Sequence, residues 1–416
     1  MIAHTAFFES LGAMRENQPA WKPVFAGLVV LRLVDSFRDY PERARTMEAT
    51  TIASARAAAS GIQEGDPTRE ILRRIISLLD EERGLSPKVG RELLLYGRAL
   101  DLEAQWALAA DVFQTIAESF SGAENIDLII EASTALGAAA RTTGDWKTSD
   151  RGYARAQHLA DTSRNRALSL TVRVGVAGSH MVHGNLPAAD EELEGVVEEA
   201  REHNLQQVEA IAIHAQGAVA LSRQDYQRAV HLAYRSLELT VNKTARERIL
   251  GDIAAAYAGL GMRDAARDGY SIVAITSPHQ WVRWQATVNL MELAVADGDE
   301  AQFDCYAEKL NSAALDPRLY AYSRYYQGLG MRRFGRGNAD EMLRHARSYA
   351  AQHQLHQIVF EIDEALQPAS ANADVATAQP AIDVDENPAE LKRIAEVIMH
   401  LREDAIAQAS ESPIFS

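Results

Sequence analysis

Two pairs of histidines are the residues of this chain whose spacing could support metal chemistry. His180 and His183 are three positions apart, as are His353 and His356, so each pair could lie on one turn of a helix and share an ion. Neither pair has a carboxylate at the spacing of a metal site, and the sequence contains no Glu-x-x-His pattern. We therefore expect no bound metal and no other cofactor.

Glycine-containing turns and a single thiol provide no enzyme motif either. Lys147-Thr148 follows Gly144, but the other glycines of a phosphate-binding loop and the strand that leads into one are absent. Cys305 has no obvious base beside it in the sequence. Because no set of acid, base and nucleophile is visible, we expect the protein not to be an enzyme.

The charge balance argues against direct binding of nucleic acid. The 416 residues include 42 Lys and Arg against 58 Asp and Glu, which gives a formal charge of −16. Such a chain repels the phosphate backbone unless its basic residues are strongly segregated. Hydrophobic residues make up 47% and aromatic residues 7%, with alanine prominent throughout, so we expect a helix-rich globular protein packed through small side chains.

Cysteine usage and the apolar runs indicate a cytoplasmic protein. Cys305 is the single cysteine, which excludes a disulfide within the chain and favours a reducing compartment. The longest apolar run, 24–34, is interrupted by Arg32, and the N-terminal residues lack the basic and apolar regions of a signal peptide. We expect no membrane association, and the Ala- and Arg-rich composition is typical of a bacterium.

The strongest pattern in the sequence is a repeat with a period of forty residues. A bulky column reads Trp106, Trp146, Leu186, Tyr226. A small column three positions later reads Ala109, Ser149, Ala189, Ala229, and a column nine positions before the bulky one reads Gly97, Gly137, Ala177, Gly217. Breaks such as Gly144-Asp145 separate two helical stretches in each period, which predicts helix hairpins that bury their apolar faces by stacking.

One segment of the repeat resembles the tetratricopeptide repeat (TPR) family. Leu136-Gly137, Gly144-Asp145-Trp146, Ser149, Tyr153 and Ala156 follow the family's order of Leu-Gly, glycine-aromatic, small, aromatic and small residues. The family's usual period is shorter, so the forty-residue period implies a variant with longer helices. After Tyr226 the period shortens to thirty-seven. The resemblance implies an all-α, right-handed α-solenoid of stacked antiparallel hairpins.

Four regions are expected along the chain. Residues 1–88 form a helical region of worn repeats or a cap, and residues 89–365 form the solenoid. Residues 366–388, rich in Ala, Asp and Pro, form a disordered linker. Residues 389–409 form an amphipathic helix.

The resemblance also implies a binding groove, because in this family one stripe of each first helix faces the concave surface. The groove residues are Arg91, Leu94, Arg98, Thr134, Arg141, Val174, Met181, Ile211, His214, Leu221, Tyr322, Tyr325, Arg332. The arginines at one end either hold peptide carboxylates or pair with Asp101 and Glu131. The apolar centre takes a peptide or packs internally, and the tyrosine cluster 320–326 is an aromatic platform or half-buried packing.

The last helix carries one apolar seam that must be covered. Its members, three and four positions apart, are Leu391, Ile394, Ile398, Leu401. In one interpretation the helix folds back as a cap on the last repeat. In the other it docks on a partner or pairs with a second copy to form a homodimer.

These features together predict a scaffold or adaptor that binds a protein or peptide on the concave face. The alternative is a regulatory sensor whose solenoid binds a signalling peptide or small ligand and controls a partner such as a transcription regulator. The Lys and Asn set with which some TPR proteins clamp the acidic ends of chaperones is missing, so the identity of the partner stays open.

Overall fold

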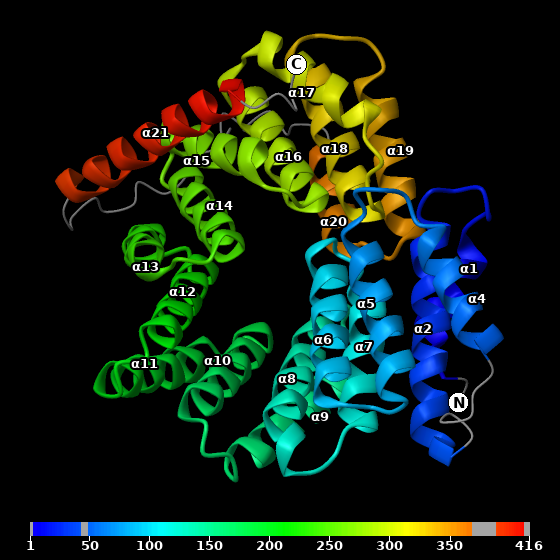
Figure 1. Cartoon of the computed structure of the whole chain (residues 1–416). Coiled ribbons are helices and arrows are strands. Elements are labelled where there is room, and N and C mark those ends of the chain that lie inside the picture. Colours follow the sequence, from blue (N-terminus) through cyan, green and yellow to red (C-terminus); the bar gives the residue numbers. More distant parts are fainter. Residues whose placement is uncertain (1–2, 43–48, 368–387, 412–416) are drawn as a thin grey trace. The chain divides into compact units, whose positions relative to one another are not determined.

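The chain is built from helices. The computed structural model describes residues 3–42, 49–367 and 388–411, and the regular elements in these ranges are helical (Figure 1). This confirms the predicted all-α class. The helices are α1 Thr5–Ala13, α2 Trp21–Asp39, α4 Ala49–Ser60, α5 Pro67–Glu82, α6 Pro87–Leu102, α7 Trp106–Ser119, α8 Ile126–Thr142, α9 Trp146–Ala160, α10 Arg166–Val182, α11 Leu186–Glu202, α12 Gln206–Ser222, α13 Tyr226–Leu239, α14 Lys243–Gly259, α15 Arg263–Thr276, α16 Gln280–Asp297, α17 Glu300–Ser312, α18 Pro317–Arg333, α19 Ala339–Gln352, α20 His356–Leu366 and α21 Pro388–Glu411, with a short 3₁₀ helix at Ala123–Asn125.

These helices form two compact units, Met1–Ala212 (unit 1) and Ile213–Ser416 (unit 2), and the boundary falls inside α12. The expected solenoid over 89–365 therefore extends over both units. Most of the expected linker, residues 368–387, lies outside the described residues. In the parts of the chain that the structure describes, no helix has the length and apolarity needed to cross a bilayer.

The forty-residue pattern sets the turn inside each hairpin. The four bulky residues of the repeat are the first residues of α7, α9, α11 and α13. The residue two positions before each of them has positive φ, and at Gly144 this angle is 79°. At three of the four turns the next residue caps the second helix with its side chain; the Asp145 carboxylate, for example, accepts the Thr148 backbone N–H at 3.1 Å. The repeat thus encodes a left-handed turn, a cap and a packing residue in fixed order.

Small residues let the two helices of a hairpin approach closely in unit 1. A Cβ on Gly137 in α8 would lie 2.9 Å from the Tyr153 ring of α9, and a Cβ on Gly97 in α6 would clash with Phe113 of α7. Helices α6, α8 and α10 also contact one another in succession. We call the surface formed by these three the first-helix face of unit 1. The contacts between successive helices confirm the predicted stack of antiparallel hairpins.

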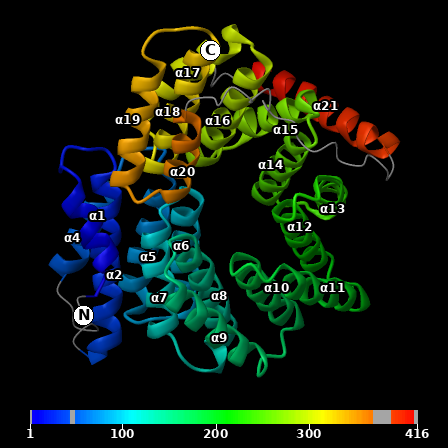
Figure 2. The ribbon, with the colours of Figure 1, turned by 180° about the vertical axis from the view of Figure 1, so that it is seen from behind.

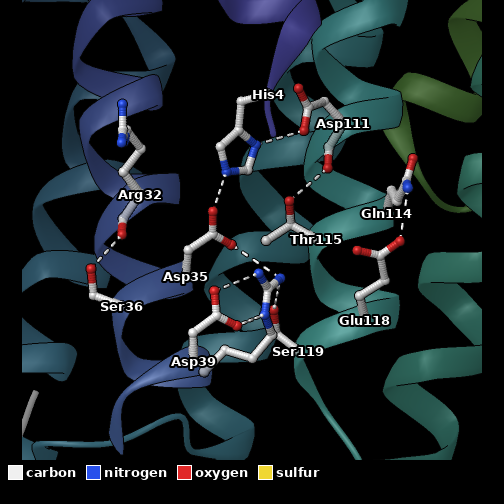
Figure 3. A network of polar contacts seen from close by, with 11 residues as sticks. His4, Arg32, Asp35, Ser36, Asp39, Asp111, Gln114, Thr115, Glu118 and Ser119 are labelled. Atoms are coloured by element: carbon white, nitrogen blue, oxygen red, sulfur yellow. Dashed lines mark hydrogen bonds and ion pairs between the residues drawn. The ribbon is translucent and has the colours of Figure 1, made fainter. Parts of the chain in front are cut away.

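The N-terminal helices of unit 1 are joined to the first hairpin by a buried charge network (Figure 3). His4 donates from Nδ1 to Asp111 of α7 and from Nε2 to Asp35 of α2, both at 2.8 Å, and its side chain is 4% exposed. Burial alone would lower the pKa of His4, but the hydrogen bonds and charges of Asp111 and Asp35 outweigh it and raise the pKa to about 9. His4 is therefore an imidazolium at neutral pH and holds the start of α1 against α2 and α7.

Unit 2 repeats the hairpin arrangement with the shorter period. Helix α14 packs on α15, α16 on α17 and α18, and α18 on α19 and α20. A bulky residue again meets a glycine across neighbouring hairpins, since a Cβ on Gly259 at the end of α14 would clash with the Tyr226 ring of α13. We call the surface formed by α14, α16, α18 and α20 the first-helix face of unit 2.

The C-terminal helix α21 folds back within unit 2. It packs along α15, as both views display (Figures 1 and 2), and it also contacts α13. Ile394 and Ile398 are 1% and 0% exposed in the core of this unit. The Tyr257 hydroxyl donates to the Leu391 carbonyl at 2.8 Å, and Arg402 reaches Asp268 at 2.5 Å. The seam is thus covered by α15 and α13, whereas the fold-back interpretation placed it on the last repeat.

Candidate functional site

The arginines at one end of the expected groove are already paired. Arg91 and Arg98 of α6 both donate to the carboxylate of Glu131 on α8, the second at 2.8 Å. Leu94, between them, is 2% exposed and belongs to the core of unit 1. The arrangement matches the ion-pair alternative for Glu131, so Arg91 and Arg98 tie two first helices together.

An open groove of about 680 Å³ lies beside this ion pair, between α5 and α6. Its lining residues are Glu70, Arg73, Arg74, Ser77, Leu78, Pro87, Lys88, Arg91, Glu92. The basic side chains have acidic partners here too: Arg73 meets Glu70 at 3.0 Å and Arg74 meets Glu92 at 2.9 Å. These pairs leave little unbalanced charge for a ligand.

The next stretch of the first-helix face, on α8 and α10, is more open to a ligand. Val174 and Met181 are half-buried on α10. The Arg141 side chain of α8 reaches across to Gly178 of α10. Its guanidinium fills the space that a Cβ on Gly178 would occupy. Its Nη1 is buried and has no hydrogen-bond partner among the described residues. Thr134, one to two turns earlier on α8, uses its hydroxyl to bind the Ile130 carbonyl at 2.8 Å.

The three expected groove residues on α12 belong to different units. Ile211, 38% exposed, lies in unit 1, whereas His214 and Leu221 lie in unit 2. His214 Nε2 is 2.7 Å from the Asp252 carboxylate on α14, and Leu221 packs against the core of unit 2.

A cluster of tyrosines dominates the first-helix face of unit 2. The Tyr322 and Tyr326 rings of α18 are stacked at 6.3 Å between centroids, and the Tyr325 and Tyr326 rings are tilted at 5.0 Å. All three are half-buried. Tyr322 packs against two small hydrophobic cores, one that includes Met291 of α16 and one that includes Ile358 of α20. The cluster thus spans three neighbouring first helices.

Two carboxylates accompany the tyrosines from the flanking helices. The Tyr326 hydroxyl donates to Glu292 of α16. Burial and the charge of Glu361 raise the pKa of Glu292, and the hydrogen bond from Tyr326 acts against them. Burial raises the pKa of Tyr325 to about 12, and the charges of Glu361 on α20 and of Glu292 act in the same direction. Glu361 accepts from the Gln357 amide at 3.0 Å. No described Lys, Arg or His forms an ion pair with Glu292 or Glu361.

The remaining expected groove residue of this unit, Arg332, is engaged elsewhere. It donates to the Ala365 carbonyl at 2.5 Å and to Asp340 at 2.6 Å. Tyr326 belongs to the tyrosine cluster predicted from the sequence, and Glu292 falls on the groove-facing stripe of α16. Glu361 was not predicted, because α20 lay at the margin of the expected solenoid.

The histidine pairs make aromatic contacts in the structure. His183 lies 5.4 Å from the Trp146 ring, and His353 lies 4.4 Å from the Tyr349 ring. Among the described residues, no three His, Cys, Asp or Glu side chains come together in a way that could hold a metal ion.

The repeated turn and the stacked hairpins define a helical-repeat protein. No family model matches the sequence, and no curated protein matches it. Among solved structures, the crystal structure of the apo form of RapI resembles the chain with a TM-score of 0.36 and 13% identity, over 92% of this chain and 99% of that one.

Proposed function

We propose that the protein is a TPR-like scaffold that binds a peptide or a segment of another protein along its first-helix faces. The second helices fill the space between neighbouring hairpins, as the Tyr153 ring does where it lies 2.6 Å from the Cβ position of Gly175. Part of the outward stripe of the first helices stays open beside that packing: Val174 and Met181 are half-buried and Ile211 is exposed. An elongated surface of this kind suits an extended or helical segment.

The observation that carries the proposal is the stripe on α8 and α10. Val174 and Met181 offer half-buried apolar area, and Arg141 beside them retains an N–H without a partner among the described residues. Partly exposed apolar side chains beside a cationic group are typical of peptide-binding surfaces. A bound segment would cover the apolar area of Val174 and Met181.

The test is selection of peptides from a displayed random library on the purified protein. We expect enriched peptides, and Met181→Glu should weaken their binding about ten-fold or more because it places a charge among apolar contacts. Ala154→Glu adds the same charge at an exposed site on α9, a second helix, and should leave binding unchanged. Failure to enrich any peptide would reject the proposal, and equal effects of the two substitutions would reject the stripe on α8 and α10 as the binding surface.

The sensor alternative uses the same surface and differs in its ligand. A scaffold should be stabilised against thermal unfolding by a peptide and not by small metabolites, because stabilisation follows the occupancy of the native state. A shift in melting temperature with a small molecule alone would favour the sensor.

A further inference from the structure

The first-helix face of unit 2 differs chemically from that of unit 1. It presents the rings of Tyr322, Tyr325 and Tyr326 together with the carboxylates of Glu292 and Glu361. Aromatic faces carry negative electrostatic potential, and a carboxylate beside them adds a full negative charge. Both components attract the same kind of ligand group, which is a cation.

The charges around the cluster remain negative when its neighbours are included. Glu364 also lies close enough for its charge to act on Tyr325. Arg318, at the start of α18, is a nearby cation, and it is hydrogen-bonded to the Tyr322 hydroxyl. Three carboxylates against one guanidinium leave an excess of about two negative charges. A cationic side chain would balance part of this excess.

The elements that hold the cluster in place are rigid. Tyr322, Tyr325 and Tyr326 lie on one helix, α18, whose buried side packs through Leu319 and Ala321 into the cores on either side. Glu292 is fixed by its hydrogen bond from Tyr326, and Glu361 by its bond from Gln357. A cation could therefore bind without a rearrangement of the rings, which limits the entropic cost of binding.

We propose that this surface, formed by Tyr322, Tyr325, Tyr326, Glu292 and Glu361, binds an arginine or lysine side chain of a peptide. The inference rests on the proposed peptide-binding function and adds the chemistry of the ligand. The cation lies over the tyrosine rings, and Glu292 and Glu361 accept its N–H groups. Contributions of this type depend on salt, because the site is open to solvent.

The test uses the full chain and the peptides that a displayed dodecapeptide library yields on it. The peptides should carry Arg or Lys, and replacement of that residue by Gln should weaken binding about ten-fold. The double variant Glu292→Gln/Glu361→Gln should weaken the parent peptide by a similar factor. The same double variant should not change the affinity of the Gln-substituted peptide, because that peptide has no cation to pair with the two carboxylates.

A matched control separates this site from general electrostatic attraction. Glu308→Gln/Glu341→Gln removes two exposed carboxylates from the second helices α17 and α19 and should not change the affinity. Tyr325→Leu should weaken binding a few-fold, while Tyr325→Phe should not. Melting curves of each variant establish that it is folded.

The outcomes distinguish the two proposals. Peptides that bind without Arg or Lys, or whose affinity survives Glu292→Gln/Glu361→Gln, would overturn the cation site and leave the peptide-binding function standing. Equal losses in the control variant would also overturn the site. A library that yields no binding peptide would overturn both.

Discussion

The docked C-terminal helix offers a sharp test of the packing in unit 2. Ile398 of α21 is fully buried against α15 and its neighbours, whereas Ile406, two turns further along the same helix, is 45% exposed. Substitution of each by alanine removes the same three carbons and changes helix propensity equally. The difference between Ile398→Ala and Ile406→Ala therefore measures burial alone.

The size of the effect follows from the environment of the two side chains. Replacement of a buried isoleucine by alanine costs about 2–5 kcal/mol, and a substitution at an exposed position costs below about 1 kcal/mol. A loss of about 3 kcal/mol corresponds to a roughly 100-fold shift in an equilibrium. If α21 detaches from α15 while the rest of unit 2 stays folded, the roughly 100-fold shift applies to the equilibrium between the docked and the detached helix.

Amide hydrogen exchange of α21 reports that equilibrium directly. In Ile398→Ala, the amides of residues 391–405 should exchange roughly 100-fold faster than in the parent, and those of Ile406→Ala should change little. Equal acceleration in the two variants would refute the docked position of the seam, as would unchanged exchange in Ile398→Ala.

Three further substitutions test the other packing claims. Because the pKa of His4 is raised from 6.5 to about 9, its imidazolium contributes stability in full below about pH 6.5 and loses it as the pH rises through 9. His4→Gln should remove a few kcal/mol of this dependence, measured by urea unfolding at about pH 6 and pH 9.5; an unchanged pH dependence would contradict the network. Gly137→Leu should destabilise by about 1–3 kcal/mol, because its Cβ would stand 2.9 Å from the Tyr153 ring. Gly251→Ala, with nothing within 4 Å of the Cβ position on α14, should stabilise by about 0.5–1 kcal/mol in thermal unfolding; a loss of stability there would show that the packing is misread.

The fold could be predicted from the positions that recur every forty residues, because each of them has a local structural role in the hairpin. Trp146 begins a helix because Gly144 and Asp145 before it supply the turn and the cap. The small residue at Gly137 allows the close approach of Tyr153. Requirements that recur every forty residues can be read without knowledge of contacts between distant parts of the chain.

Contacts between distant residues could not be read in the same way. The apolar seam on α21 predicts that another element covers this helix. It does not predict that Asp268 and Tyr257 provide the polar partners. Likewise, nothing in the sequence connects His4 with Asp111, which is 107 positions away. Such pairings depend on how whole helices stack.

Part of the candidate site could be predicted from the sequence. The tyrosines of α18 stood out by spacing, and the ion pair of Arg91 with Glu131 was one of two alternatives. Glu361 was missed because its role depends on α20 packing beside α18, and a glutamate on a short helix resembles an ordinary solvated residue. The sequence thus identifies the stripe, and the stacking decides which side chains share it.

The central claim is that the first-helix faces receive a bound segment. It is tested most directly by photo-crosslinking a library-selected peptide that carries a benzophenone group and mapping the attachment points by mass spectrometry. Crosslinks should fall on α8 and α10 or on α16, α18 and α20. Crosslinks confined to α9, α11, α17 or α19 would contradict it.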